Sequence, residues 1–417
     1  MSRLRQALAT LVALAVAALA FVAWAPVPAV DDREAAAPLA PDAAQAARGA
    51  QLALAGNCAG CHTERGGAPY AGGRGIETPF GTVVAGNLTP DPATGLGRWT
   101  AGEFRRALQH GVSRDGRLLV PAFPYTSFTQ VTRDDADALW AHLRSLPPVQ
   151  QAKRPHALRW PYGSDLALRV WRALYFRPGT TPADPAQSAE WNRGAYLVRG
   201  LGHCEACHAR RDALGGIRGA AALQGGRLPQ GWYAPSLTDA TEAGVADWPI
   251  DEVVRLLRTG LSEHGTAQGP MAEVVVRSTQ HLAEADLRAV AVYLRSLPVT
   301  TSRPGRSGAR DPQVMARGQA LYADLCRGCH GDEGQGAPGV YPALAGSRMV
   351  TMADTTNLLR VITQGGFAPA TAANPRPYGM PPFDLGHADL AALMTWLRAT
   401  WGHDASPVSE VQVLTAR

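Results

Sequence analysis

The chain has 417 residues, of which 46% are hydrophobic and 18% charged, a composition typical of folded domains with cores of their own. Its length predicts about three domains, and its 44 glycines and 32 prolines favour short helices joined by long loops. The formal net charge is +5, but there is no Lys/Arg-rich run of the kind that follows a phosphate backbone, so we expect no nucleic acid partner.

The N-terminus has the order of charges of an export segment. Two arginines precede an apolar stretch from Leu11 to Trp24, and three acidic residues follow. This order predicts a signal peptide or N-terminal anchor over residues 1–29, with the rest of the chain on the periplasmic side of the bacterial cytoplasmic membrane. Cleavage after Ala29 fits the pattern. An uncleaved anchor stays open, because the apolar run is long for a signal and short for a span.

A Cys-x-x-Cys-His motif occurs three times and accounts for every cysteine of the chain. Its members are Cys58, Cys61 and His62, then Cys204, Cys207 and His208, then Cys326, Cys329 and His330. Two thiols one helical turn apart reach the two vinyl groups of one porphyrin, and the histidine supplies an axial nitrogen to the iron. The sequence therefore predicts three covalently bound haem c groups, whose propionates would add a charge of about −6 and leave the holoprotein near neutral. A zinc or redox role for the cysteine pairs is the alternative, and the histidines and the exported context argue against it.

The three motifs lie in an internal repeat. An Arg-Gly pair precedes each first cysteine by eight to ten residues, and an amphipathic helix closes each unit. We expect an all-α fold of three tandem cytochrome c domains, each with a few short helices around one haem and with long Pro/Gly-rich loops. The predicted domains are 45–149, 188–299 and 313–403, with linkers at 30–44, 150–187 and 300–312 and a tail at 404–417.

The repeat also predicts where helices lie. The closing helices are expected at 135–146, 284–297 and 388–400, where Trp140, Tyr293 and Trp396 would each face the glycine of the Arg-Gly pair. Middle helices that end at a glycine are expected at 99–111, 248–260 and 357–365. Each middle helix carries an arginine that is either solvated or next to a haem propionate, namely Arg106, Arg255 and Arg360.

One further helix is expected in the linker, at 166–176. We interpret it as a packing strut. A contact with a partner or with a membrane surface is the alternative.

The ligands on the two faces of each iron can be assigned in part. A backbone carbonyl usually fixes the ring of an axial histidine, and the loops at Pro79, Pro235 and Pro342 are the candidates. Methionine on the opposite face would raise the potential and close the iron to other ligands. Met271, the only methionine between residues 209 and 314, lies in a loop Gly-Pro-Met, and Met380 follows its helix-ending glycine at a similar distance.

The first unit departs from this rule. Phe123 occupies the expected position, 12 residues after Gly111, and cannot ligate iron. His110, a weak candidate, and the histidines at 142 and 156 are the only local alternatives, so no sixth ligand of haem 1 is assigned. We expect haem 1 to lack a strong sixth ligand.

With these motifs in place, the chain resembles the three-haem cytochrome c subunits of bacterial periplasmic membrane-bound dehydrogenases. The resemblance covers nearly the whole mature length and is carried by Thr78-Pro79-Phe80-Gly81, Asn87-Leu88-Thr89-Pro90-Asp91, the segment from Trp191 to Leu197, Ser278-Thr279-Gln280-His281-Leu282 and Gly379-Met380-Pro381-Pro382-Phe383.

The resemblance implies an electron-transfer subunit without a catalytic site of its own. Such a subunit accepts electrons from a quinoprotein, flavoprotein or molybdopterin dehydrogenase that oxidises an alcohol, polyol or aldehyde, and delivers them to ubiquinone or a terminal oxidase at the membrane surface. It also implies Met271 and Met380 as ligands. Many members have methionine where this chain has Phe123, and the segment from Pro121 to Tyr125 is more similar to subunits paired with molybdenum-containing aldehyde or N-heterocycle oxidoreductases.

A haem peroxidase acting at haem 1 is the rival from another class. It would need an acid–base group on the distal side of the iron. Only His110 and Arg114 lie near enough in the sequence to suggest one.

Overall fold

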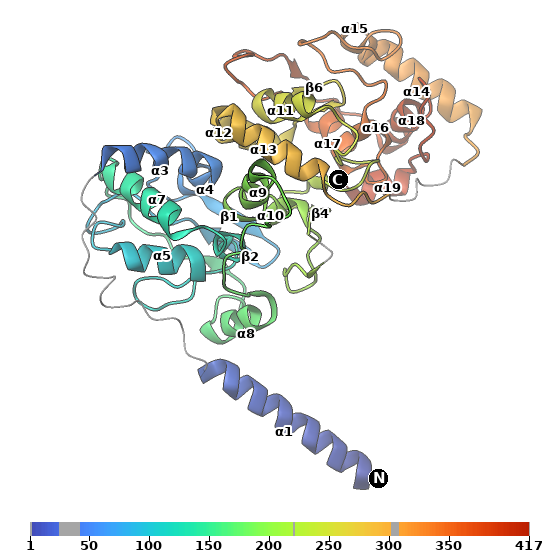
Figure 1. The fold of residues 1–417 in the computed structure, drawn as a ribbon. Coiled ribbons are helices and arrows are strands. Elements are labelled where there is room, and N and C mark those ends of the chain that lie inside the picture. Colours follow the sequence, from blue (N-terminus) through green and yellow to red (C-terminus); the bar gives the residue numbers. More distant parts are fainter. Residues whose placement is uncertain (1, 25–41, 220–221, 302–307, 417) are drawn as a thin grey trace. The chain divides into compact units, whose positions relative to one another are not determined.

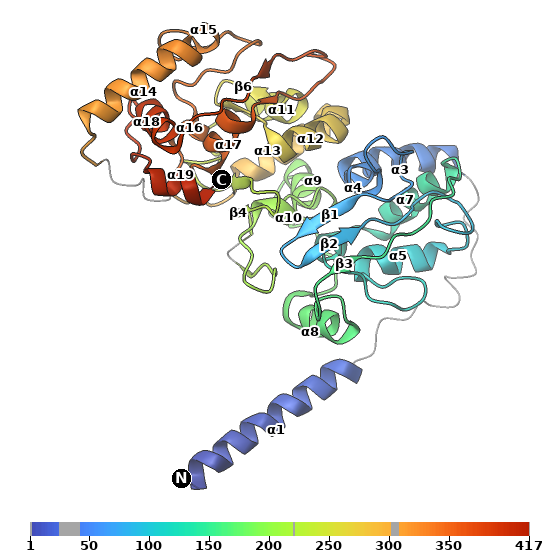
Figure 2. The same cartoon turned by 180° about the vertical axis from the view of Figure 1, so that it is seen from behind.

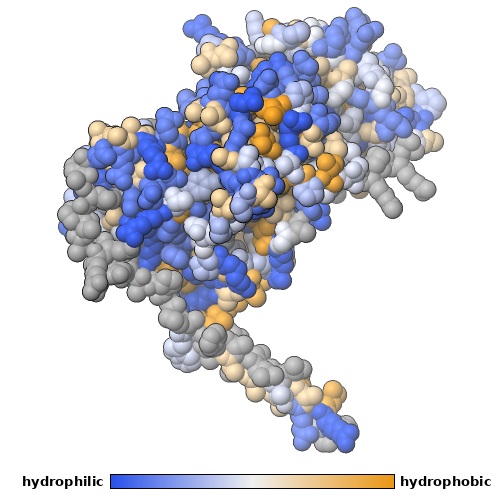
Figure 3. All heavy atoms as spheres, viewed as in Figure 1, coloured by the Kyte–Doolittle hydropathy of each residue, from blue (hydrophilic) through white to orange (hydrophobic). Residues whose placement is uncertain are grey.

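The protein divides into two compact units, which we describe separately. A computed structural model describes residues 2–24, 42–219, 222–301 and 308–416. The first unit comprises Met1–Ala183, Arg199–His203 and Arg211–Arg218, and the second comprises Asp184–Val198, Cys204–Arg210 and Gly219–Arg417. Most of the regular structure is helical, and in the view of Figure 3 the surface is mostly hydrophilic with small hydrophobic patches.

The same pair of crossing helices recurs in each third of the chain (Figure 1). The pairs are α3 (Ala43–Ala55) with α7 (Arg133–Ser145), α9 (Ala189–Tyr196) with α13 (Glu284–Arg295), and α14 (Pro312–Leu325) with α18 (His387–Leu397). At each crossing a glycine lies against a backbone carbonyl of the closing helix, and a Cβ atom there would overlap that oxygen. These glycines are Gly49, Gly194 and Gly318. The crossing is therefore tight enough to require the glycine of each Arg-Gly pair.

The arginine of each Arg-Gly pair has a repeated role as well. It forms an ion pair with an aspartate of the closing helix, and the pairs are Arg48–Asp135, Arg193–Asp286 and Arg317–Asp389. The aromatic residue predicted beside the glycine is present as Tyr293 and Trp396, but not in the first third. There His142 lies beside Gly49, and Trp140 packs on Phe104 instead, at 5.4 Å between ring centroids. Trp140 lies two residues, or about 200° around the helix, from the position that faces the glycine.

The three middle helices also form as predicted. They are α5 (Ala101–His110), α11 (Ile250–Thr259) and α17 (Thr356–Gln364). Each ends at a glycine with a positive φ angle, where the backbone turns out of the helix, and the glycine amide still bonds back into the last turn. The linker helix α8 (Asp165–Tyr175) is confirmed as well.

Short strands accompany the helices, and the all-α expectation did not include them. In the first unit β1 (Gly75–Thr78), β2 (Gly81–Val84) and β3 (Ala157–Leu158) form an antiparallel sheet in that order (Figure 2). The second unit has three two-stranded pairs: β4 (Gln224–Arg227) with β5 (Tyr233–Ser236), β6 (Leu261–Ser262) with β7 (Gly265–Thr266), and β8 (Gly366–Phe367) with β9 (Gly379–Met380). With two to four residues each, they leave no alternating pattern long enough to be recognised in a sequence.

The remaining helices are short and lie around the motifs. They are α4 (Cys58–His62), α6 (Tyr125–Phe128), the π-helix η1 (Leu197–Leu201), α10 (Glu205–His208), α12 (Gly269–Arg277), the 3-10 helix η3 (Thr279–His281), α15 (Arg327–His330), α16 (Arg348–Thr351) and α19 (Glu410–Ala416).

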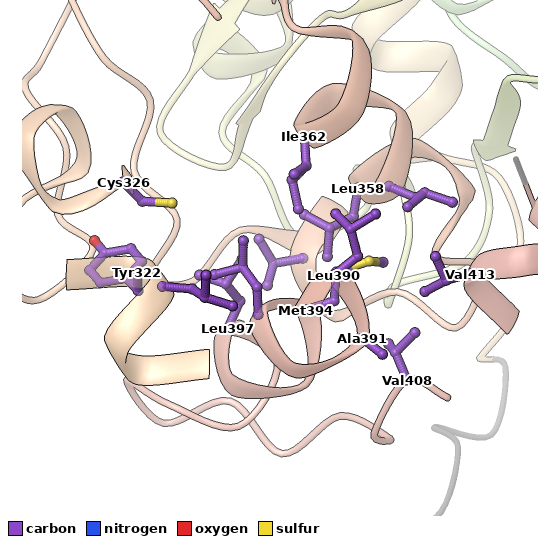
Figure 4. Packing of buried hydrophobic residues seen from close by; sticks show 14 residues of the cluster. Tyr322, Cys326, Leu358, Ile362, Leu390, Ala391, Met394, Leu397, Val408 and Val413 are labelled. Atoms are coloured by element: carbon purple, nitrogen blue, oxygen red, sulfur yellow. The ribbon is translucent and has the colours of Figure 1, made fainter. Parts of the chain in front are cut away.

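The C-terminal segment, predicted to be a tail, belongs to a core of the second unit. Leu358 and Ile362 of α17 point toward Leu390 and Met394 of α18 (Figure 4). Val408 and Val413 of the C-terminal segment are buried in the same cluster. Residues 404–416 therefore pack against the third helix pair because they supply apolar side chains that close its core.

The N-terminal segment is the helix α1 (Ser2–Trp24). Among the helices of the described residues, none is both long and apolar enough to cross a membrane. The predicted cleavage point after Ala29, most of the linker 30–44 and residues 302–307 of the linker 300–312 lie outside the described residues.

Candidate functional site

Each Cys-x-x-Cys-His motif forms a short helix. In the first, α4 carries Cys58 and Cys61 on consecutive turns and ends at His62. The helices α10 and α15 carry the second and third motifs in the same way, with the first cysteine of each at the N-cap. None of the six cysteines is in a disulfide. Burial raises the pKa of the Cys58 thiol to about 12, so the free thiol is protonated near neutral pH.

The axial histidines are oriented alike. The Nδ1 atom of each lies within hydrogen-bond distance of a backbone carbonyl, and the pairs are His62 with Gly86 at 2.7 Å, His208 with Pro235 at 2.7 Å and His330 with Pro342 at 3.0 Å. Burial lowers the pKa of all three imidazoles, which keeps them neutral. A neutral ring that donates through Nδ1 leaves Nε2 free to ligate a metal.

Two of the three predicted carbonyl acceptors are correct. The loops at Pro235 and Pro342 supply the oxygen, but Pro79 does not, because it lies in the turn between β1 and β2. Gly86 takes this role and was missed. The repeat contains the signal for it, since Asn87-Leu88-Thr89 aligns with Ser236-Leu237-Thr238 and places Gly86 in register with Pro235.

The two candidate methionine ligands lie on different local structures. Met271, predicted in a loop, is in the first turn of α12, where Pro270 is tolerated because the first amides of a helix need no partner. Met380 lies on β9, paired with Gly366 of β8. Both are partly buried, whereas Met394 is fully buried in the core of Figure 4, as a packing residue should be.

In the first unit an aromatic pair occupies the place of a methionine. The Phe123 ring lies 5.3 Å from that of Phe128, between centroids, on the segment that leads into α6. The Phe128 ring in turn lies 5.3 Å from that of His203, and the two phenyl rings themselves offer only carbon atoms.

Two of the three local histidines are engaged elsewhere. His156 accepts the Val84 amide through Nδ1 at 3.1 Å, and His142 lies at the helix crossing with its ring against Tyr70. His110 lies near Arg172 of α8, and burial together with this guanidinium lowers the pKa of its imidazole. The Nδ1 atom of His110 is buried and has no hydrogen-bond partner within the described residues.

The peroxidase alternative has no assembled acid–base pair in the described residues. Arg114 is about half exposed and its Nε donates to Glu103 at 3.3 Å. His110 faces Arg172 rather than Arg114 in its electrostatic contacts.

The residues present fit a haem c group at each motif. The thiol pair and the neutral imidazole with its carbonyl partner are donors that such a group takes. In addition, the Nε atoms of Arg106 and Arg360 are buried and lack an acceptor within the described part of the chain, whereas Arg255 pairs with Glu252 at 2.7 Å.

Comparisons with known proteins agree with this geometry. The cytochrome c family model matches residues 46–147 and 315–401. A subunit of the nicotinate dehydrogenase of Pseudomonas putida is 42% identical over 372 residues, which cover 87% of this chain but only 31% of that protein, so the chain spans about a third of this relative.

Two other relatives match over most of both chains. The cytochrome c subunit of the quinone-type alcohol dehydrogenase of Gluconacetobacter polyoxogenes is 36% identical over 386 residues, 87% of this chain and 82% of that one. The gluconate 2-dehydrogenase cytochrome c subunit of Pantoea cypripedii is 34% identical over 380 residues, 86% of each chain. With this coverage, the protein belongs to the family of dehydrogenase cytochrome c subunits.

Proposed function

We propose that this protein is a tri-haem cytochrome c that carries electrons from a periplasmic dehydrogenase to ubiquinone or a terminal oxidase and has no catalytic site of its own. The observation that carries the proposal is the threefold recurrence of one arrangement: a Cys-x-x-Cys-His helix whose histidine bonds to a carbonyl, in each third of the chain with its own helix pair. When bound, a haem supplies one-electron transfer.

The number of haems per chain depends on the haem of the second motif, because the family model matches only the first and last thirds of the chain. We expect the purified protein to contain three haems per chain by pyridine haemochrome analysis. A Cys204→Ala/Cys207→Ala variant should lose a third of this haem and keep the rest. Two haems per chain in the unaltered protein would contradict the proposal. If the function is right as well, substrate added to the co-purified dehydrogenase will reduce all the haem of the chain.

The catalytic partner is proposed to be a quinoprotein, flavoprotein or molybdopterin dehydrogenase that oxidises an alcohol, polyol or aldehyde. A molybdenum-containing aldehyde or N-heterocycle oxidoreductase is the second candidate. The similarity to the nicotinate dehydrogenase subunit supports it, together with Phe123 in the first unit.

We place the protein on the periplasmic side of the cytoplasmic membrane, in contact with its surface. The support is an apolar face of the first unit, formed by residues on and beside α8. Trp160 is 89% exposed, and Tyr162, Leu166, Leu174 and Leu214 are each at least 40% exposed. The Tyr162 ring packs on that of Phe80 at 4.5 Å between centroids, and Trp171 donates a hydrogen bond to the Leu214 carbonyl, which ties these segments together.

Tryptophan and tyrosine prefer the interface between lipid and water, and this α8 apolar face has both. We expect a Trp160→Ser/Leu166→Ser variant of the exported protein to bind on the order of a hundredfold more weakly to vesicles of phosphatidylethanolamine and phosphatidylglycerol, because the two large apolar side chains each contribute about 1.5–3 kcal/mol when buried. Co-sedimentation measures the binding. Phe367→Ser, at a residue 68% exposed in the second unit, is the matched control. Equal binding of the three proteins would contradict a contact through this face.

The proposed haem propionates have candidate partners. Arg106 and Arg360 recur at one position of the middle helices and keep a buried, unpaired Nε within the described residues. Charge-assisted bonds from a guanidinium to a carboxylate would satisfy these donors.

A further inference from the structure

A buried carboxylate lies one peptide group away from the second axial histidine. The His208 Nδ1 lies 2.7 Å from the carbonyl oxygen of Pro235. The amide of Ser236 belongs to the same peptide group, and it donates to Oε2 of Glu242 at 2.6 Å. The imidazole, the peptide and the carboxylate therefore form one continuous hydrogen-bonded chain.

The surroundings of Glu242 make its charge matter. The residue is 8% exposed, and the Tyr233 hydroxyl donates to the same carboxylate at 2.9 Å. Burial raises the pKa of Glu242, and the bonds from Ser236 and Tyr233 act in the opposite direction. The other charges near it are the buried Asp239 and the partly buried Asp354, which raise the pKa further.

The nearby arginines interact with neighbours of Glu242 rather than with its carboxylate. Arg227 pairs with Asp354 at 2.9 Å. Arg210 acts on Tyr233, whose own pKa is raised by burial and by Glu242. Within the described residues, no arginine or lysine forms an ion pair with Glu242 itself.

The peptide that joins the two groups is held in place. Tyr233 donates its amide to Asn357 at 2.9 Å and accepts from the Asn357 side chain at 2.7 Å, two residues before Pro235 on β5. Pairing with β4 fixes the other edge of β5. The carbonyl of Pro235 and the amide of Ser236 thus keep their directions when the charge at Glu242 changes.

The first and third motifs lack this chain of contacts. The peptides that accept from His62 and His330 continue into the amides of Asn87 and Ala343, and within the described residues neither amide bonds to a carboxylate. In the repeat, Ala93 stands six residues after Asn87, where Glu242 stands six residues after Ser236. The feature therefore distinguishes the second motif.

We propose that Glu242 sets the redox potential of the haem at His208 through the Pro235–Ser236 peptide group, so that this potential falls when Glu242 is ionised. The proposal rests on the haem of the second motif assigned under the proposed function. Glu242 acts through His208 and is a positioning residue.

The direction follows from electrostatics. An ionised Glu242 polarises the peptide, which makes the Pro235 oxygen a stronger acceptor and the His208 ring more electron-rich, and this favours ferric over ferrous iron. Protonation has the opposite effect. Over the pH range in which Glu242 is ionised in the ferric and protonated in the ferrous protein, one electron enters the iron from the reductant and one proton enters the carboxylate from water.

Spectroelectrochemical titration of the holoprotein over a series of pH values tests this. The titration should resolve three redox transitions, one for each haem, and the second haem's transition is the one that Met271→Ala alters. The potential of this transition should decrease as the pH rises through the Glu242 titration. In Glu242→Gln it should be higher at neutral pH and independent of pH in this range. In Tyr233→Phe the inflection should move to higher pH, because the carboxylate loses a donor. The ferrous protein should also show a His208 Nδ1–H proton resonance that moves with pH in the unaltered protein and not in Glu242→Gln.

The matched control is Asp239→Asn, which removes a buried carboxylate of the same loop that accepts from Thr241 rather than from Ser236. A potential that is the same in Glu242→Gln as in the unaltered protein would overturn the proposal, and so would equal shifts in the two variants. Haem content is measured on the same samples. A missing third haem would refute the proposed function, whereas three haems with an unresponsive second potential would refute only the role of Glu242.

Discussion

A Phe123→Met variant is expected to lose the high-spin ferric signal and the carbon monoxide binding that we expect from haem 1. The two other thirds of the chain present Met271 and Met380 at the corresponding distance from a helix-ending glycine. A thioether at residue 123 would supply the missing ligand, so that about one haem in three changes from high to low spin and gains potential. Electron paramagnetic resonance and absorption spectra with carbon monoxide measure both changes.

The fold should tolerate this substitution. Phe123 is only partly buried, and its ring meets Phe128 at 5.3 Å rather than filling a sealed core. The methionine side chain is flexible and similar in length to that of phenylalanine, so the substitution should cost about 1 kcal/mol in folding free energy. A change in spin state would therefore report ligation and not unfolding.

Three further variants make the result unambiguous. Phe123→Leu removes the ring without adding a ligand and should keep the high-spin signal. Met380→Phe should create a second open haem. His110→Ala should change nothing, because the His110 ring lies beside Arg172. Three low-spin signals in the unaltered protein would contradict an open haem 1, and loss of one of them in His110→Ala would identify that histidine as the ligand.

The elements that the sequence predicted correctly are those with local causes. The middle helices follow from amphipathic spacing and a terminal glycine, which act within one helix. The role of Gly194 followed from the repeat, because three copies of one pattern provide an internal alignment. The carbonyl partners at Pro235 and Pro342 were predicted from prolines that follow their motifs.

The rest depends on contacts between distant residues. Gly86 replaces Pro79 because the β1–β2 turn carries Pro79 away from His62, and strands of four residues leave little pattern in a sequence. Met271 lies in a helix although its Gly-Pro start suggested a loop, since proline is favoured in the first turn. Glu242 has no motif at all. Its bond to Ser236 forms only once the loop has folded.

The C-terminal segment gives the second large prediction, through Arg398. This arginine is 2% exposed at the end of α18. Its guanidinium donates to the carbonyls of Val350 and Met352, at 2.6 and 2.8 Å, and to Ser406 at 2.9 Å. One side chain thus joins α16, α18 and the segment that carries α19. Burial lowers its pKa to about 10, so that it remains a cation at neutral pH.

We expect Arg398→Met to release the segment from 404 onward. Three bonds from a charged donor are lost, and two buried carbonyls and one partly buried carbonyl are left without this partner, at a total cost on the order of 4 kcal/mol. Hydrogen exchange followed by mass spectrometry should show faster exchange at Val408 and Val413, which are buried in the core that the segment completes. Arg398→Lys keeps the charge but cannot reach the carbonyls on both sides, so its exchange rates at these residues should lie between those of the unaltered protein and those of Arg398→Met.

The control separates a buried bridge from an ordinary ion pair. Arg288 pairs with Asp251 at 3.1 Å on an exposed face of α13. Arg288→Leu should change the free energy of opening by less than about 1 kcal/mol. If Arg398→Met exchanged no faster at Val413 than this control, the bonds of Arg398 would not be what holds the segment, and the burial of Val408 and Val413 would have to suffice alone. We expect the opposite, because apolar contacts bring the segment to the core but only the guanidinium satisfies the carbonyls that lie beneath it.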